Sequence, residues 1–116
     1  MTGNVLVVDD SGFARRTLRL MLESAGLTVD EASNGNDALE RYFLRRPDLV
    51  LLDLVMEGMT GMEVLARLRE LDPQARVIVA TADVQSSTRA EAQASGAAGF
   101  INKPFEAKRN GSFWGW

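Results

Sequence analysis

The sequence contains no cysteine, no histidine and no long apolar segment. Because cysteine is absent, disulfide bonds, thiolate metal sites and thiol catalysis are excluded, and the chain suits a reducing compartment. No stretch of about 18 or more apolar residues is present, which argues against a membrane-spanning helix. The start Met-Thr-Gly-Asn lacks the pattern of a signal peptide. We therefore expect a cytoplasmic protein.

An excess of positive charge is also missing. The chain has 13 Lys and Arg residues against 16 Asp and Glu residues, for a formal net charge of -3. This balance gives no global attraction to nucleic acid or to anionic membranes, so we expect neither as a direct partner. The 116 residues, 46% hydrophobic and 25% charged, have the make-up of one ordinary globular domain.

Short apolar runs alternate with amphipathic segments along the chain, with Gly, Asn, Pro or Asp between them. The apolar runs predict strands at about 4–9, 28–32, 48–53, 76–81 and 98–101. The amphipathic segments predict helices at about 12–25, 36–45, 61–72 and 85–95. Strict alternation implies parallel strands joined by right-handed crossovers. We expect a doubly wound, flavodoxin-like α/β fold whose five strands lie in the common order 2-1-3-4-5.

The predicted helices differ in apolar content. The first has an apolar stripe at helical spacing, made of Phe13, Leu18, Met21 and Leu22. The fourth has only two alanines, Ala90 and Ala94, as candidates for a buried face. Such a helix should pack lightly and shift at low energetic cost.

Three carboxylates stand where predicted strands end. Asp9 and Asp10 follow the first apolar run, and Asp53 follows the third. Neighbouring parallel strands lie about 4.8 Å apart, so these groups should meet at the rim where open α/β folds bind ligands. Like charges about 4 Å apart repel by roughly 4 kcal/mol at an effective dielectric near 20, so we expect a cation there. Mg²⁺ fits, with Asp10 and Asp53 as direct ligands and Asp9 acting through water.

Two further side chains are candidates for the same rim. Lys103 follows the fifth predicted strand, and its long stem could carry a charge toward Asp53. Thr81 ends the fourth strand, where its hydroxyl could donate to an oxygen near Asp53. Taken alone, Thr81 would be an ordinary strand residue and Lys103 a solvated surface lysine.

Four short motifs together resemble a known family. They are Val-Asp-Asp at 8–10, Leu-Leu-Asp-Leu-Val-Met at 51–56 with Gly61, Ala-Thr-Ala at 80–82 and Lys-Pro-Phe at 103–105. In this order and at these strand ends they closely resemble the receiver domain of bacterial two-component response regulators. The resemblance covers about residues 4 to 106.

The resemblance implies a role for each site residue. Asp53 would accept a phosphoryl group from a phosphohistidine on a partner histidine kinase or phosphotransfer protein. Mg²⁺, or Mn²⁺, would be held by Asp9, Asp10, Asp53 and the main-chain carbonyl of Val55. Thr81 and Lys103 would contact the phosphoryl oxygens. Because the chain has no histidine, it cannot itself carry the phosphohistidine donor.

The resemblance also implies a readout by an unknown output protein. Phosphorylation would shift the population of two states of the surface formed by strand 4, helix 4 and strand 5. Thr81 and Phe100 would be the switch residues. The Lys103–Pro104 peptide bond would be cis. Such a domain is a signalling switch rather than an enzyme, with self-catalysed phosphoryl acceptance and slow autodephosphorylation as its own chemistry.

The C-terminal segment departs from the family pattern. Receivers continue into a full fifth amphipathic helix, whereas here Asn110-Gly111 stops a helix and an aromatic tail follows. We expect a receiver domain at 1–106 and an atypical tail at 107–116, with the fifth helix short, missing or replaced. The tail would cover the exposed sheet face, form a homodimer, or have no structural role.

Two other functions stay open from the sequence. A degenerate receiver would act as a binding or dimerisation module. A metal-dependent phosphatase would use Asp53 as a turnover nucleophile, but it needs an acid–base carboxylate two residues later, where this chain has Val55.

Overall fold

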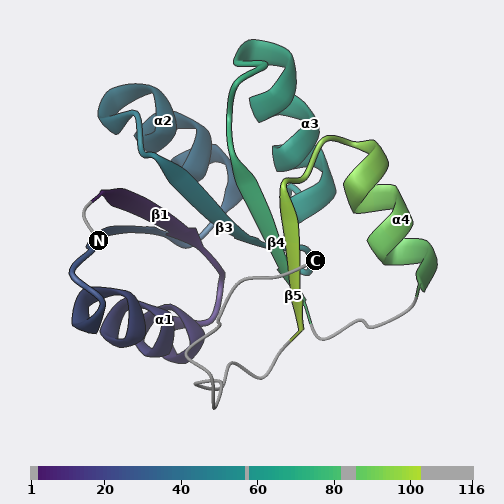
Figure 1. The fold of residues 1–116 in the computed structure, drawn as a ribbon. Coiled ribbons are helices and arrows are strands. Elements are labelled where there is room, and N and C mark those ends of the chain that lie inside the picture. The colour runs from purple at the N-terminus through teal and green to yellow at the C-terminus, as the bar shows by residue number, and fades with distance from the viewer. Residues whose placement is uncertain (1–2, 57, 82–85, 103–116) are drawn as a thin grey trace.

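Five parallel strands and four helices alternate along the described part of the chain, which is residues 3–56, 58–81 and 86–102 of the computed structural model (Figure 1). The elements are β1 Asn4–Val8, α1 Gly12–Ser24, β2 Thr28–Ala32, α2 Gly35–Arg45, β3 Leu49–Asp53, α3 Gly61–Leu71, β4 Val77–Thr81, α4 Ser86–Ala94 and β5 Gly99–Asn102. The strands lie in the order β2-β1-β3-β4-β5. The predicted fold class, strand order and element sequence are confirmed.

The sheet is buried on both faces because each strand alternates its side chains between two apolar clusters. Helices α2, α3 and α4 contribute to the cluster on one face, with β-strand residues such as Leu6, Val8 and Leu52. Helix α1 supplies Leu18 and Leu22 to the cluster on the opposite face. The layers are visible in Figure 1, where α1 lies on the other side of the sheet from α2 and α3.

The register of the sheet places the strand ends side by side. Val8 of β1 pairs with Leu52 of β3, and Asp53 pairs with Ala80 of β4. Residues that follow β1 and β3 therefore emerge next to each other at the carboxyl rim. Among the helices of the described residues, none has the length and apolar character needed to span a bilayer.

Two expectations about helix faces were wrong. Phe13 is 83% exposed, whereas Leu18 and Leu22 are buried. Phe13 precedes Leu18 by five residues, which places it about 140° away around the helix and off the buried stripe. In α4 the buried residue is Ala92, and Ala90 and Ala94 are exposed. Each of these two alanines lies two residues from Ala92, on nearly the opposite side of the helix.

Candidate functional site

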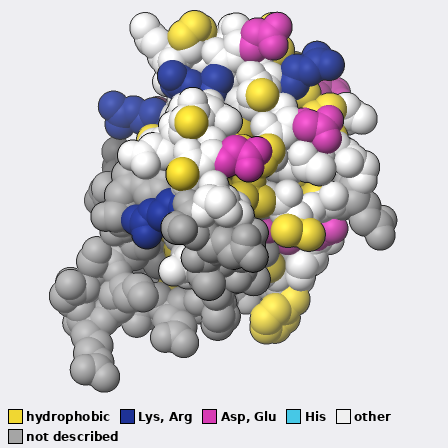
Figure 2. Space-filling view, turned by 90° about the vertical axis from the view of Figure 1, so that its right-hand side faces the viewer, with side chains coloured by type: hydrophobic (Ala, Val, Ile, Leu, Met, Phe, Trp, Pro, Cys, Tyr) yellow, Lys and Arg dark blue, Asp and Glu magenta, His cyan; other side chains and the backbone are white. Residues whose placement is uncertain are grey.

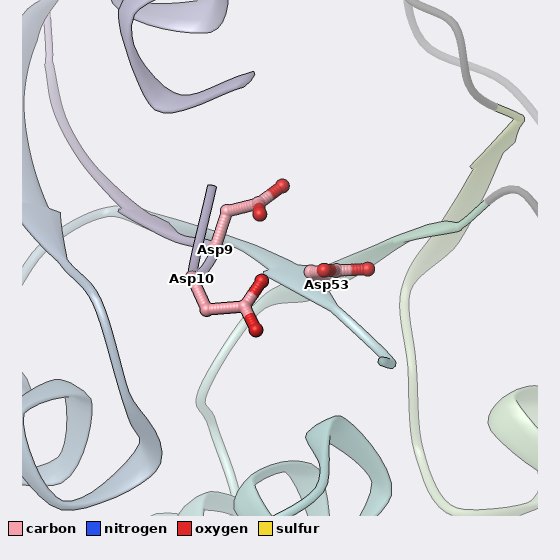
Figure 3. A group of neighbouring side chains, drawn as sticks. All are labelled: Asp9, Asp10 and Asp53. Carbon is pink, nitrogen blue, oxygen red and sulfur yellow. The ribbon is translucent and has the colours of Figure 1, made fainter. Parts of the chain in front are cut away.

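Asp9, Asp10 and Asp53 form an acidic cluster at the carboxyl rim of the sheet, as predicted. One carboxylate oxygen from each residue lies within 4.8 Å of the others. Figure 3 shows Asp9 and Asp10 at the end of β1, with their carboxylates on the side that faces Asp53 at the end of β3. Asp9 and Asp53 are buried, while Asp10 is exposed. The cluster is therefore closed on its protein side and open to solvent at Asp10.

Asp9 is held by hydrogen bonds at three of its own atoms. Its backbone N–H donates to the carbonyl of Ala32 at 3.1 Å, which extends the pairing of β1 with β2. Its Oδ1 accepts from the N–H of Ser11 at 2.9 Å. Its carbonyl oxygen accepts from Nη1 of Arg15 at 2.6 Å. Because Ser11 is also the N-cap of α1, this carboxylate is tied to the start of the helix.

Asp53 is the last residue of β3 and is 5% exposed. Its Oδ1 accepts a long hydrogen bond of 3.3 Å from the N–H of Val55. The first residue of α3, Gly61, packs directly against the Asp53 main chain. A Cβ at Gly61 would lie 2.1 Å from the carbonyl oxygen of Asp53, so only glycine fits there without movement. This close approach fixes α3 behind the acidic cluster.

Thr81 and Phe100 lie on one face of the sheet. Thr81 ends β4 one residue beyond Ala80, the partner of Asp53, and is fully buried. Side-chain alternation places Thr81 on the same face as Val79, and Val79 pairs with Phe100 of β5. Phe100 is 6% exposed, with the guanidinium carbon of Arg89 from α4 at 5.7 Å from the ring centroid. The two predicted switch residues thus belong to adjacent strands and share the face that α4 covers.

Two of the sequence-predicted site residues, Lys103 and Pro104, lie outside the described residues, as does the tail at 107–116. Their roles stay predictions. For Val55, the side chain is 71% exposed beside the cluster. The role of its main-chain carbonyl as a metal ligand also stays a prediction.

Two of the three arginines of α1, Arg15 and Arg19, pair with an acidic residue of β2. Nε of Arg15 donates to Oε1 of Glu31 in β2 at 3.1 Å, and Arg19 forms a close ion pair with Oε2 of the same carboxylate. Arg16 is exposed. The contact of Arg15 with the Asp9 carbonyl was missed from the sequence. The available signal was Glu31, an acidic residue on the strand that neighbours β1.

The donor set suits a hard divalent cation. Three carboxylates in close reach of one another repel unless a cation or protons intervene, and oxygen ligands of this kind match Mg²⁺, which retains several waters in its octahedron. The exposed position of Asp10 leaves space for such waters. The site is therefore fit to hold Mg²⁺ beside a buried carboxylate at Asp53.

Comparisons with known proteins identify relatives along nearly the whole chain. The family model of the response regulator receiver domain matches residues 5–110. The chemotaxis protein CheY of Thermotoga maritima is 39% identical over 94% of this chain and 92% of the relative. CheY of Halobacterium salinarum is 42% identical over 91% of this chain and 88% of the relative. The solved CheX-CheY-BeF3-Mg complex from Borrelia burgdorferi contains a chain with a TM-score of 0.87 and 35% identity, covering 89% of this chain and 79% of that one.

Proposed function

Because the chain belongs to the response regulator receiver family, close to the CheY-type chemotaxis regulators, we propose that it is a signalling switch whose phosphoacceptor is Asp53. Receiver domains act in phosphorylation-dependent signalling and bind Mg²⁺ at an acidic pocket. The observation that carries the proposal for this chain is the cluster of Asp9, Asp10 and Asp53 at the carboxyl rim. Asp53 is the member that ends the central strand, β3, of the sheet.

The proposed reaction is transfer of a phosphoryl group to a carboxylate. An Asp53 oxygen attacks phosphorus in line with the phosphohistidine of a partner kinase or phosphotransfer protein, the N–P bond breaks, and the imidazole leaves. The product is an aspartyl phosphate, a mixed anhydride that water later hydrolyses to aspartate and inorganic phosphate. Such a transfer needs positioning and charge neutralisation more than acid–base groups.

Each site residue has a part in this proposal. Asp9, Asp10, Asp53 and the Val55 carbonyl would hold Mg²⁺, which supplies positive charge to the phosphoryl oxygens. Thr81 would donate its hydroxyl to one of these oxygens, and Lys103 would add a second cation. Neither group acts as a turnover catalyst, so we propose a switch with self-catalysed acceptance and slow loss of phosphate rather than an enzyme. We place this action in the cytoplasm, where a partner kinase would meet it.

The readout would pass from Thr81 through Phe100 to α4. These residues share one face of the sheet, and the ring of Phe100 already contacts Arg89 of α4. Figure 2 shows the side of the molecule that carries α4, where basic, acidic and apolar side chains are interspersed over the part drawn in colour. A change in the position of α4 would alter this mixed surface, which we propose as the contact with an output protein.

The test is phosphorylation in the absence of any partner. The protein is incubated with Mg²⁺ and acetyl phosphate, and modification is followed by intact mass. We expect about one phosphoryl group per chain, lost on standing. Asp53→Asn should remove the modification. Glu40→Gln, which changes an exposed carboxylate on α2, is the control and should leave it intact.

The same experiment separates the alternatives. Sustained release of phosphate over many turnovers would support a metal-dependent phosphatase. Failure of the wild-type chain to react with acetyl phosphate or to bind beryllofluoride would support a degenerate receiver that acts as a binding or dimerisation module. Unchanged modification of Asp53→Asn would place the acceptor elsewhere.

For the C-terminal segment, we propose that residues 107–116 pack against β4 and β5 on the face of the sheet that α1 covers at β1 and β2. Helix α1 packs against β1 and β2, while Ile78, Ala80 and Ile101 of β4 and β5 face the same side. The aromatic composition of the segment suits an apolar surface. Sedimentation and unfolding of the full chain are compared with a chain that ends at Arg109. Lower stability of the shorter chain supports the proposal, a shift from dimer to monomer indicates an intermolecular contact, and equal behaviour refutes both.

A further inference from the structure

Arg15 joins the acidic cluster to the neighbouring strand. From the first turns of α1 it reaches back over the β1–α1 connection, where Nη1 donates to the carbonyl of Asp9 at 2.6 Å. Its Nε donates to Oε1 of Glu31 on β2 at 3.1 Å. The Arg15 side chain is 20% exposed and that of Glu31 is 28% exposed, so both groups are partly shielded from water. A planar guanidinium held at two points is a rigid link.

The carbonyl that Arg15 contacts belongs to the peptide unit between Asp9 and Asp10. Other bonds already fix the N–H and the carboxylate of Asp9, through Ala32 and Ser11. The bond from Arg15 fixes the remaining polar atom of the Asp9 main chain. The orientation of this peptide unit sets where the Asp10 side chain starts. Asp10 itself is exposed, so the placement of its carboxylate depends on this peptide unit.

We propose that Arg15 is a positioning residue of the cation site, which orients the Asp9–Asp10 peptide so that both carboxylates face Asp53. This inference rests on the proposed function, since it concerns the cation that the cluster would hold. Arg15 touches no reacting atom and acts through the main chain of Asp9. Groups that orient metal ligands in this way are worth about 10–100-fold in metal affinity.

The positive charge of Arg15 acts in the opposite direction. A guanidinium near the cluster repels a divalent cation, so removing it would tighten binding if charge were the dominant effect. The ion pair with Glu31 offsets this charge, because Glu31 brings a carboxylate within hydrogen-bond distance of the same guanidinium. Orientation should therefore outweigh repulsion.

Arg19 provides a matched control. It lies one turn further along α1, pairs through Nη1 with the same Glu31 carboxylate and through Nε with Glu23, and directs Nη2 toward the carbonyl of Val29 at 3.4 Å. The hydrogen bonds of Arg19 within the described residues go to Glu23, Glu31 and the Val29 carbonyl, which lie outside the acidic cluster. Arg19→Gln thus removes the pair with Glu31, together with the exposed pair to Glu23, without removing a hydrogen bond to the cluster.

The experiment measures Mn²⁺ and Mg²⁺ binding by calorimetry for the full chain, together with urea unfolding without metal. We expect Arg15→Gln to weaken binding about 10-fold or more, and Arg19→Gln to change it less than about twofold. Both variants should lose stability without metal, because each loses its pair with Glu31, and Arg19→Gln also loses the exposed pair with Glu23. Arg15→Lys keeps the charge but lacks the planar fork, so it should also bind more weakly than the wild type.

Each other outcome has a definite meaning. Tighter cation binding by Arg15→Gln, with normal binding by Arg15→Lys, would show that charge dominates. Equal losses of cation affinity in Arg15→Gln and Arg19→Gln would show a merely structural role for Arg15. Either result overturns the inference. If Arg15→Gln does not fold, Glu31→Gln should weaken binding several-fold by freeing the guanidinium, and unchanged binding would refute the proposal. Failure of the wild-type chain to bind any divalent cation would instead refute the proposed function.

Discussion

Helices α3 and α4 cover the same face of the sheet, and each follows a strand that ends in a site residue, yet they are held very differently. α3 follows Asp53 of β3, and α4 follows Thr81 of β4. Buried residues of α3 are Gly61, Val64, Leu65 and Leu68. Among the α4 side chains that the structure describes, Ala92 alone is buried. Burying an aliphatic side chain stabilises by about 1.5–3 kcal/mol, against roughly 0.8 for one methyl-sized group.

The polar contacts increase this difference. α3 begins with a capping box in which Thr60 and Glu63 satisfy each other's backbone N–H groups. After its last turn, Asp72 accepts a hydrogen bond of 2.7 Å from the hydroxyl of Tyr42 in α2. The acceptor strand is thus backed by a helix fixed at both ends, while the strand carrying Thr81 is backed by a lightly packed one. A phosphoacceptor site needs a rigid support, whereas a surface that changes on phosphorylation needs a helix that can move at low energetic cost.

The largest loss of stability is expected from a substitution at Gly61, the first residue of α3. In an exposed helix, Gly→Ala usually stabilises by up to about 1 kcal/mol. Here an added Cβ would lie 2.1 Å from the Asp53 carbonyl and 2.5 Å from Cα of Leu54, so α3 or the end of β3 must shift. We expect Gly61→Ala to destabilise by about 1–3 kcal/mol, measured as a lower midpoint of urea unfolding.

Gly12, the first residue of α1, is the control for Gly61. A Cβ there would lie 3.6 Å from Nη2 of Arg15, an ordinary contact. Gly12→Ala should therefore be neutral or slightly stabilising. Equal stabilisation by both substitutions would contradict the view that α3 is pressed against the main chain of Asp53.

A smaller effect is expected at Tyr42, whose hydroxyl ties α2 to the end of α3. Tyr42→Phe removes this hydrogen bond but keeps the buried ring, so the free energy of unfolding should fall by about 1 kcal/mol near neutral pH. Urea unfolding of both proteins measures the difference. Loss of less than about 0.3 kcal/mol would indicate that water replaces the hydroxyl equally well.

The pH dependence of stability provides a second test of the Tyr42→Phe variant. Burial, followed by the hydrogen bond to Asp72, raises the pKa of Tyr42 to about 12. A group whose pKa is higher in the folded state contributes stability that is complete below its usual pKa, near 10, and is lost as pH rises toward 12. The stability advantage of the wild type over Tyr42→Phe should therefore shrink between about pH 10 and 12. The hydroxyl of Tyr42 also lowers the pKa of Asp72, so part of the advantage is lost on acidification through the folded-state pKa of Asp72.

The strands and the positions of their last residues could be predicted from the sequence, because both are set by the backbone of the sheet. The apolar runs that end at Val8 and Leu52 predict buried parallel strands, and parallel strands bring their carboxyl ends to one rim. For this reason, the grouping of Asp9, Asp10 and Asp53 could be predicted from the sequence alone. Two neighbouring strands leave little freedom in where their last residues lie.

Helix faces and long side chains were not predictable in the same way. Phe13 is a large apolar residue, but it lies off the face of α1 that packs against the sheet. In α4, Ala92 is buried in place of Ala90. A shift of one or two residues rotates a helix face by 100° or more, and an alanine-rich helix offers no strong pattern to fix it. Arg15 could reach several acceptors from α1, so its bond to the Asp9 carbonyl depends on the packing of α1 against β2.

The smallest effect on stability is expected at the contact between Arg89 and Phe100. This contact tests whether α4 is the more loosely packed of the two helices. Arg89→Met keeps the apolar stem over the ring and removes the cation. An exposed cation–π contact contributes about 0.5–1 kcal/mol, so global stability should change by no more than this. Arg67→Met on α3 is the control, since Arg67 is exposed and forms no ion pair or hydrogen bond with the described residues.

Hydrogen exchange distinguishes local loosening from a general loss. Because Ala92 is the single buried side chain in the described part of α4, Arg89→Met should speed amide exchange in α4 and β5 while leaving α3 unchanged. In Arg67→Met, neither helix should change. If exchange in α4 is unaltered by Arg89→Met, the cation does not hold the helix to the sheet. Phe100 would then be coupled to α4 through the apolar cluster that it shares with Ala92, and the position of its ring would not depend on charge at the α4 surface.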